Sequence, residues 1–201
     1  MIINSNIIIY CNVKINYHFI GRLIILNLII RKEIDSDYKL TENLVEEAFK
    51  NAEFSDHSEH FLVSRLRKSD AFIPELSIVA CDNSKVIGHI LFTKIFINDG
   101  SSNTLSLALA PLSVLPKYQG MGIGSKLIEE GLNVAKSLGF KSVIVLGHDK
   151  YYPRFGFKKA SDFNIKAPFD VPPEAFMALE LEEGSLRNVS GTVVYNKAFF
   201  E

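Results

Sequence analysis

The chain has 201 residues, 47% of them hydrophobic, which is enough to bury one substantial core, so we expect a single main domain. Its formal net charge is −1 and its basic residues form no stripe, which argues against nucleic acid as a partner. The two cysteines, Cys11 and Cys81, form no C-x-x-C pair, so we expect neither a disulfide nor a metal site, and a reducing cytoplasm is the natural compartment.

The chain opens with an apolar segment that is rich in Ile and Asn. Lys14, His18 and Arg22 interrupt it, so no uncharged run reaches the roughly 18 residues that a membrane helix needs. No small-residue cleavage site follows it, as a signal peptide would require. We interpret residues 1–28 as an apolar N-terminal extension of uncertain order, with extra strand structure or a membrane anchor as alternatives. Membrane association is not expected, and the main domain is placed at residues 29–201.

The first elements of that domain are a strand and two helices. Residues 29–34 open like a strand, and the apolar residues after them recur at helical spacing behind Thr41, a plausible helix cap. A second helix is expected at residues 60–68, with Phe61 and Leu66 facing inward.

Three strands follow. Residues 76–81 and 86–97 flank the turn at residues 82–85, which predicts a hairpin. Residues 105–115 are almost wholly apolar, as is typical of a central strand that is covered on both faces.

The pattern from residue 105 to residue 146 predicts a strand–helix–strand crossover unit. Residues 125–138 have one apolar face, which includes Leu138, and Gly139 follows as the residue that ends the helix. The buried run at residues 142–146 then predicts a strand parallel to the preceding one. Late strands are expected at residues 177–181 and 193–195. The order of elements indicates a mixed α/β fold.

Six residues between the central strand and this helix read Gln-Gly-Met-Gly-Ile-Gly, from Gln119 to Gly124. Glycine has no Cβ to block a close approach and tolerates positive φ, and a helix N-terminus offers unpaired N–H groups and partial positive charge. Together these features predict a site for phosphate groups.

Other interpretations of these glycines fit less well. A Walker loop needs Gly-Lys-Ser/Thr, but here Gly124 is followed by Ser125 and then Lys126. A dinucleotide fingerprint matches Gly120-Met121-Gly122, but the third glycine then comes too early, although Asp149 could imitate the ribose-binding acid. A tight turn that binds nothing is the remaining alternative.

The segment that begins at Val114 and Pro116 and continues through Gln119, Gly122 and Gly124 resembles motif A of the GNAT acyltransferases, Q/R-x-x-G-x-G/A. A second hallmark of that superfamily, a Tyr four residues before Gly-Phe, is matched by Tyr152. The same stretch, with the later residues 172–179, is similar to the YhbS-type predicted acetyltransferases. The resemblance covers roughly residues 29–200, and it implies a central mixed and strongly twisted sheet with helices on both faces.

The resemblance also implies a co-substrate, acetyl-CoA. In the superfamily the backbone of this glycine loop holds the pyrophosphate, and the edge of the preceding strand pairs with the pantetheine arm. A backbone N–H near Ser113 or Val114 would polarise the thioester carbonyl. The positions implied to bind acetyl-CoA are Leu112, Ser113, Val114, Leu115, Gln119, Gly120, Met121, Gly122, Ile123, Gly124, Ser125 and Tyr152.

The implied reaction is direct attack of an amine on the thioester. Tyr152 is the expected general acid for the departing sulfur, unless it only packs against the sulfur; its neighbour Tyr151 lacks the spacing to the Gly-Phe pair. The expected strand carries no carboxylate to serve as base, so we place His148 and Asp149 in that role. Glu75 and His89 are weaker candidates, and a chain of waters without a dedicated base is a further alternative.

These features predict an N-acetyltransferase whose acceptor is a small-molecule or peptide amine. The acidic tendency of residues 35–75 weakly favours a cationic amine, and residues 162–176 are the other variable segment expected near the acceptor. A homodimer is a possible assembly, since the N-terminal region is apolar. The alternative function is a non-catalytic acyl-CoA-binding regulatory module, which would keep the glycine loop but need no Tyr152.

Overall fold

The computed structural model describes residues 9–19, 22–53 and 55–201. The chain divides into two compact units. Unit 1 comprises Met1–Ser64, Pro74–Leu91 and Pro111–Gly131, and unit 2 comprises Arg65–Ile73, Phe92–Ala110 and Leu132–Glu201. The strands β4 (Lys85–Asn98) and β5 (Asn103–Val114) and the helix α3 (Ile123–Ser137) each contribute residues to both units.

The strands of unit 1 are hydrogen-bonded in the order β1-β2-β3-β4-β5. Strand β1 (Ile9–Phe19) is antiparallel to β2 (Arg22–Lys32), which pairs in turn with β3 (Phe72–Asp82). The first strand of the expected domain therefore begins well before residue 29, and the proposed boundary after residue 28 falls inside β2. The division itself stays a prediction, and residues 1–8 of the extension lie outside the described residues.

The helix α1 (Tyr38–Phe49) begins at a different cap from the one expected. The prediction of Thr41 as the cap is wrong, because Thr41 lies fully buried inside the helix and Asp37 precedes its first residue. The Asp37 carboxylate accepts a hydrogen bond from the Ile34 N–H at 3.0 Å and pairs with Arg31 through two contacts of 2.5 and 2.9 Å. An ion pair to the preceding strand thus fixes where this helix starts.

The helix α2 (Glu59–Arg67) confirms one expected inward residue and contradicts another. Leu66 is fully buried, as predicted, together with Val63. Phe61 is 59% exposed, so its inward assignment is wrong. Phe61 is two residues from Val63, a rotation of about 200° around the helix, which turns it away from the buried side.

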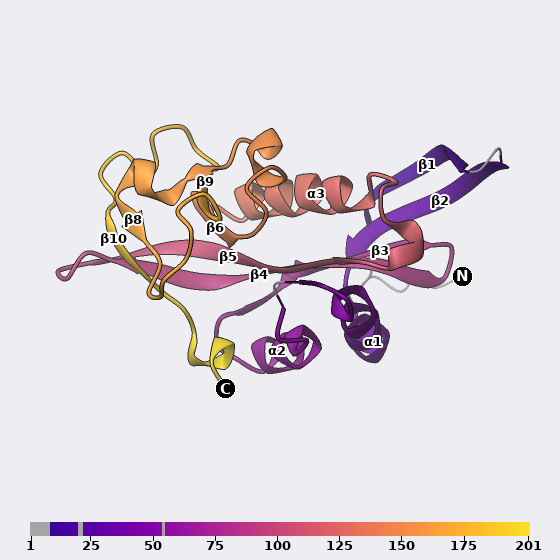
Figure 1. Ribbon diagram of the computed structural model, residues 1–201, viewed down its shortest axis with the longest axis horizontal. Helices are drawn as coiled ribbons and strands as arrows, with labels where there is room; N and C mark the ends of the chain where they lie inside the picture. Colours follow the sequence, from indigo (N-terminus) through magenta and orange to yellow (C-terminus); the bar gives the residue numbers. More distant parts are fainter. Residues whose placement is uncertain (1–8, 20–21, 54) are drawn as a thin grey trace. The chain divides into compact units, whose positions relative to one another are not determined.

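Within unit 1, α1 and the first turns of α3 lie on opposite faces of the strands (Figure 1). A Cβ added to Gly88 on β4 would stand 3.0 Å from Leu127 Cδ1 and 3.3 Å from Ile123 Cγ2, so α3 packs closely over this glycine. Gly139 has a φ of 85° after the end of α3, as a terminating glycine should. Leu138 is 44% exposed, because the helix has already ended at Ser137, and its assignment to the buried face is wrong.

Unit 2 holds the parallel pair that the sequence predicted. Strand β6 (Ser142–Leu146) runs parallel to β5, with a register from Leu107↔Val143 to Leu109↔Val145, and antiparallel to β9 (Phe176–Glu180). Short strands complete the unit: β7 (Lys158–Lys159) pairs with β9, and β10 (Gly191–Val194) pairs with β4 and with β8 (Ile165–Lys166). The sheet is therefore mixed, as expected for the predicted fold.

Candidate active site

The glycine loop belongs to unit 1 and connects β5 to α3 through a short 3-10 turn, Pro116–Tyr118. Gly120 and Gly122 have φ angles of 75° and 78°, a region that residues with a Cβ rarely adopt. Gly124 instead lies inside the first turn of α3. Two of the three glycines are thus required by the backbone path, and the third lies where the helix begins.

The backbone N–H groups of residues 120–125 make no hydrogen bond within the part of the chain that the structure describes. The next N–H, that of Lys126, donates to Gly122 O at 3.1 Å and opens the regular ladder of the helix. Such a run of unpaired donors at a helix N-terminus is a ready site for phosphate oxygens. The assignment of residues 119–125 to the pyrophosphate stays a prediction. Of the two apolar side chains in the loop, Ile123 is buried and Met121 is half-buried.

Gln119 has a role that its motif did not reveal. Its side-chain Nε2 donates to Val114 O at 3.0 Å, and its own N–H donates to Pro116 O at 3.2 Å. The side chain therefore ties the loop back to the end of β5 within unit 1. The sequence shows that Gln119 lies five residues after Val114, but it does not show that the side-chain amide of Gln119 turns back toward the Val114 carbonyl.

The last residues of β5 show how its edge is oriented. Leu115 N donates to Ile87 O on β4 at 3.0 Å. Backbone N–H groups alternate in direction along a strand, so the N–H of Val114 points away from β4. Ser113 and Leu115 are buried, whereas Leu112 and Val114 are half-buried. The Ser113 hydroxyl is buried without a hydrogen-bond partner in the described part of the chain.

Tyr152 lies in unit 2, where it begins a short 3-10 helix, Tyr152–Phe155, that ends at Gly156 in the left-handed region. Its side chain is 8% exposed and lies against Gly147, where an added Cβ would collide with the ring. Burial, and then the neighbouring Tyr151, raise the pKa of Tyr152 well above its usual value of 10. The phenol is therefore held in its protonated form, which suits a proton donor and not a base.

His148 and Asp149 follow β6 in unit 2 and are both exposed. The backbone oxygen of His148 accepts from Tyr151 N at 3.0 Å, which forms the turn that leads to Tyr152. Neither side chain has a hydrogen bond or ion pair within the described residues that would orient it. Their proposed role as base therefore stays a prediction.

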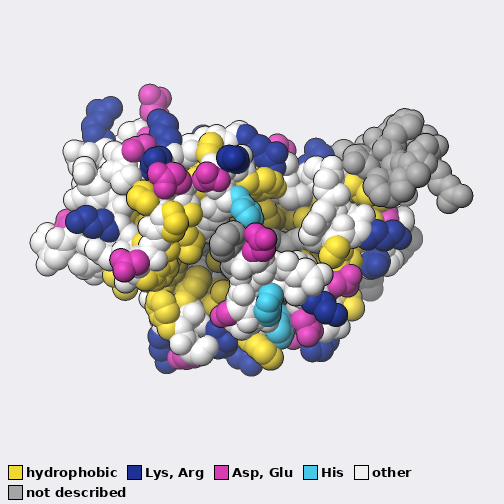
Figure 2. Space-filling model, viewed as in Figure 1, with side chains coloured by type: hydrophobic (Ala, Val, Ile, Leu, Met, Phe, Trp, Pro, Cys, Tyr) yellow, Lys and Arg dark blue, Asp and Glu magenta, His cyan; other side chains and the backbone are white. Residues whose placement is uncertain are grey.

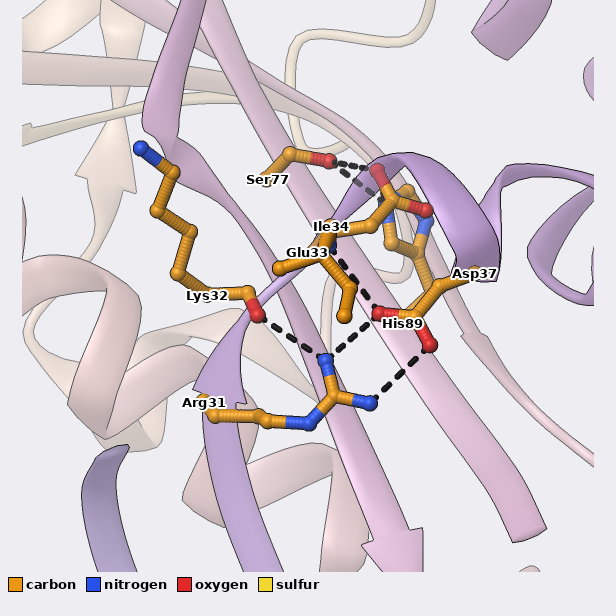
Figure 3. A network of polar contacts seen from close by, with 7 residues as sticks. All are labelled: Arg31, Lys32, Glu33, Ile34, Asp37, Ser77 and His89. Carbon is orange, nitrogen blue, oxygen red and sulfur yellow. Dashed lines mark hydrogen bonds and ion pairs between the residues drawn. The ribbon is translucent and has the colours of Figure 1, made fainter. Parts of the chain in front are cut away.

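The two weaker base candidates lie in unit 1, and both are engaged. Glu75 pairs with Lys32 at 3.0 Å, and this hydrogen bond lowers the pKa of Glu75. His89 is fully buried, with its Nε2 3.1 Å from Ser77 Oγ. Figure 3 shows His89 together with Ser77 and Glu33.

The two segments expected near the acceptor differ in character. In unit 1 the acidic tendency of residues 35–75 is reduced by internal contacts, since Asp37 pairs with Arg31 and Glu59 accepts from Ser55. In unit 2, Phe169 is 40% exposed and stacks on Tyr195 with ring centroids 6.0 Å apart. Figure 2 shows hydrophobic side chains gathered at the surface. An exposed apolar patch of this kind is typical of a binding surface.

Among the described residues, no group of three or more His, Cys, Asp or Glu side chains is arranged to hold a metal ion. None of the helices in that part of the chain is both long enough and apolar enough to span a bilayer.

The acetyltransferase (GNAT) family model matches residues 39–157, which is more than half of the chain and includes both the glycine loop and Tyr152. The chain belongs to the GNAT acetyltransferase family. It is 41% identical over 122 residues to the uncharacterized N-acetyltransferase YjhQ of Escherichia coli, covering 60% of this chain and 67% of that protein. It is 29% identical to the uncharacterized N-acetyltransferase YhbS of the same species, covering 86% and 98%.

Two solved GNAT structures share this fold. One is the crystal structure of E. coli YhbS in complex with CoA, with a TM-score of 0.78 and 28% identity over 92% of this chain and 97% of that one. The other is a GNAT acetyltransferase from Brucella melitensis in complex with acetyl-CoA, with a TM-score of 0.71 and 34% identity over 86% and 97%. These similarities confirm the predicted family and the mixed α/β GNAT fold.

Proposed function

We propose that this protein is an N-acetyltransferase that transfers the acetyl group of acetyl-CoA to a primary amine by direct attack in a ternary complex. The observation that carries the proposal is the run of unpaired N–H groups at residues 120–125, where α3 begins. Family membership supports it, as do the two GNAT structures that are complexes with CoA and acetyl-CoA.

The donor would lie along unit 1. The N–H groups of Gly120, Met121, Gly122, Ile123, Gly124 and Ser125 hold the pyrophosphate oxygens, and the positive end of the α3 dipole adds to their attraction. Gln119 keeps these groups in place through its bond to Val114 O. Residues 112–115 form the strand edge for the pantetheine arm. Acetyl-CoA supplies an acetyl group already activated as a thioester.

Of the two N–H groups considered for the thioester carbonyl, we favour that of Val114. The bond from Leu115 N to Ile87 O directs the N–H groups of Leu115 and Ser113 toward β4. The N–H of Val114 is directed to the other side of the strand, away from β4. A donor aimed at the carbonyl oxygen stabilises the negative charge that develops there during attack.

Tyr152 would protonate the departing sulfur. Burial raises its pKa, so the phenol carries its proton at every physiological pH. The raised pKa also makes the phenol a weaker acid, so the proton moves as negative charge builds on sulfur and not before. The candidates for the base that the sequence indicated, His148 and Asp149, follow β6.

A direct test is thermal unfolding with acetyl-CoA, CoA or NAD, followed by release of free thiol with three amine probes. Putrescine represents a cationic acceptor, benzylamine fits the aromatic surface of unit 2, and the N-terminus of an alanine tripeptide represents a peptide. Saturation with CoA at about 100 times its Kd should stabilise the fold by about 2.7 kcal/mol. Stabilisation without thiol release from any amine would favour the non-catalytic acyl-CoA-binding module instead.

The proposal extends to the cellular location of the protein and to its assembly. Cys81 is a buried free thiol, which is compatible with a reducing cytoplasm. A homodimer through the apolar N-terminal region is testable by light scattering on the full chain.

A further inference from the structure

Four polar side chains are buried in a row across four neighbouring strands of unit 1. Glu33 follows the last residue of β2, and Ser77, His89 and Ser113 lie on β3, β4 and β5. Their exposed fractions are 3%, 1%, 0% and 2%. Burying polar groups in a sheet is costly unless they find hydrogen-bond partners, so these four buried side chains call for an explanation.

Three members of the row are joined by directed hydrogen bonds (Figure 3). Ser77 Oγ lies 2.5 Å from Glu33 Oε2 and 3.1 Å from His89 Nε2. A serine hydroxyl has one proton and a carboxylate only accepts, so Ser77 donates to Glu33 and accepts from the Nε2–H of His89. His89 Nε2 is 3.9 Å from Glu33 Oε2, too far for a direct bond, so the hydroxyl is the link between them.

The fourth member lies at the proposed donor edge. The bond from Leu115 N to Ile87 O joins the chain just after β5 to β4, and Ser113 on β5 lies two residues before Leu115. Gly88 faces α3, so its neighbour His89 faces the other side of the sheet. Because buried hydroxyls are seldom left without a partner, the unpartnered Ser113 Oγ points to a ligand at this end of the row.

We propose that His89, Ser77 and Glu33 form a proton relay that removes the proton released by the acceptor amine, with Glu33 as its final holder. This inference rests on the proposed acetyl transfer. As the nitrogen–carbon bond forms and the carbon–sulfur bond breaks, the amine gives one proton to the His89 ring. His89 passes its Nε2 proton to Ser77, and Ser77 passes its hydroxyl proton to Glu33.

The step leaves Glu33 as a neutral acid, while the departing sulfur takes its proton from Tyr152. Reversal of the relay to solvent after product release, and reprotonation of Tyr152, restore the starting state. The arrangement explains how a base can act although residues 105–111 carry no carboxylate.

Nearby charges are paired among themselves. Arg31 is bound by Asp37 through two contacts, and Lys32 is bound by Glu75 at 3.0 Å. These four groups flank Glu33 along the chain and on β3.

The test compares Glu33→Gln and His89→Gln with the wild type. Both substitutions keep the size of a hydrogen-bonding side chain but cannot carry the proton. We expect kcat with the best of putrescine, benzylamine and alanine tripeptide to fall about 100-fold at pH 7, as loss of a general base does. The loss should shrink as pH rises, because hydroxide then takes the proton. Glu182→Gln, on an exposed ion pair of unit 2, is the matched control and should keep full activity.

Two further readouts separate a relay from a structural role. The affinity for CoA, measured by calorimetry, should stay unchanged in both variants. Nitrogen NMR of His89 in the enzyme without donor should show the proton on Nε2, and Ser77→Ala should abolish the signature of its hydrogen bond. Ser77→Ala keeps the backbone bond to Glu33, so it carries the same kinetic expectation if Glu33→Gln does not fold.

Unchanged kcat in all three variants, or a His89 proton on Nδ1, would overturn the relay while the acetyl transfer itself stands. A wild-type protein that binds CoA but acetylates none of the three amines would overturn the relay and the proposed transfer together. A uniform loss of kcat at every pH, matched by a loss of CoA affinity, would show a structural role only and would also overturn it.

Discussion

The side-chain amide of Gln119 donates to the backbone oxygen of Val114 across 3.0 Å, which ties the glycine loop to the strand before it. Both residues belong to unit 1, as do the donors of residues 120–125 that the bond steadies. The polar residue of the motif thus acts on the protein backbone, and in the proposed phosphate site the donors are main-chain groups.

Gln119→Ala should therefore weaken CoA binding without removing a direct contact. Loss of one such hydrogen bond costs about 1 kcal/mol, which corresponds to roughly a fivefold rise in Kd. Calorimetric titration with CoA measures the change. Asn133→Ala, at an exposed position on α3, is the control and should leave Kd unaltered. Equal affinities for wild type and Gln119→Ala would show that the loop holds its shape without this bond.

The substitution Gly122→Ala tests the cost of the positive φ angle alone, because the added methyl group would not collide with neighbouring atoms. The φ of Gly122 is 78°, yet an added Cβ would meet no atom within 4 Å, so the cost is conformational, about 1–2 kcal/mol. Gly100→Ala is a matched control, since Gly100 also has a positive φ, 94°, and open space. Urea unfolding should show similar losses of stability for both variants, whereas only Gly122→Ala should raise the Kd for CoA. A similar effect of Gly100→Ala on CoA binding would contradict the assignment of the loop.

Tyr152→Phe should reduce turnover and leave CoA affinity nearly intact, because it removes the proton donor and keeps the buried ring. General acid catalysis contributes about 100-fold or more, and kcat should fall accordingly. Tyr151→Phe tests the adjacent alternative and should retain activity. Steady-state kinetics with thiol detection distinguish the two variants. If Tyr151→Phe lost activity and Tyr152→Phe kept it, Tyr151 and not Tyr152 would be the proton donor.

Alkaline pH should destabilise the fold through two buried phenols. Burial raises the pKa of both Tyr152 and Tyr195 above the usual 10. The unfolded chain loses these protons near pH 10 while the folded chain keeps them, so stability is complete below pH 10 and declines as pH rises beyond it. Urea unfolding between pH 8 and 11 measures the slope. Tyr195→Phe should flatten it, and an equal slope in wild type and variant would oppose this explanation.

The local sequence pattern predicted those elements whose structure depends mainly on their own residues and little on distant segments. The apolar run at β6 has the bounds expected for it, and the spaced glycines form a tight loop with positive φ angles before α3, as their spacing indicated. Other features depend on contacts between segments. The start of α1 is set by the pair of Arg31 and Asp37, which no local cap signal for Thr41 could reveal.

The row of Glu33, Ser77 and His89 was hidden in the sequence for a related reason. It can be predicted only when the pairing of the strands is known, because its members are separated by 44 and 12 positions along the chain. Phe61 shows a smaller effect of the same kind: its helix was predicted, but the buried side depends on which neighbours the helix meets.

The most direct test of the central claim is amide hydrogen exchange, resolved by NMR, with and without acetyl-CoA. If the main-chain N–H groups of residues 120–125 hold the pyrophosphate, saturation with acetyl-CoA should slow their exchange by about tenfold or more, while the exposed turn at residues 99–102 stays unchanged. Saturation that leaves the exchange of residues 120–125 as fast as in the free protein would contradict the proposed donor site.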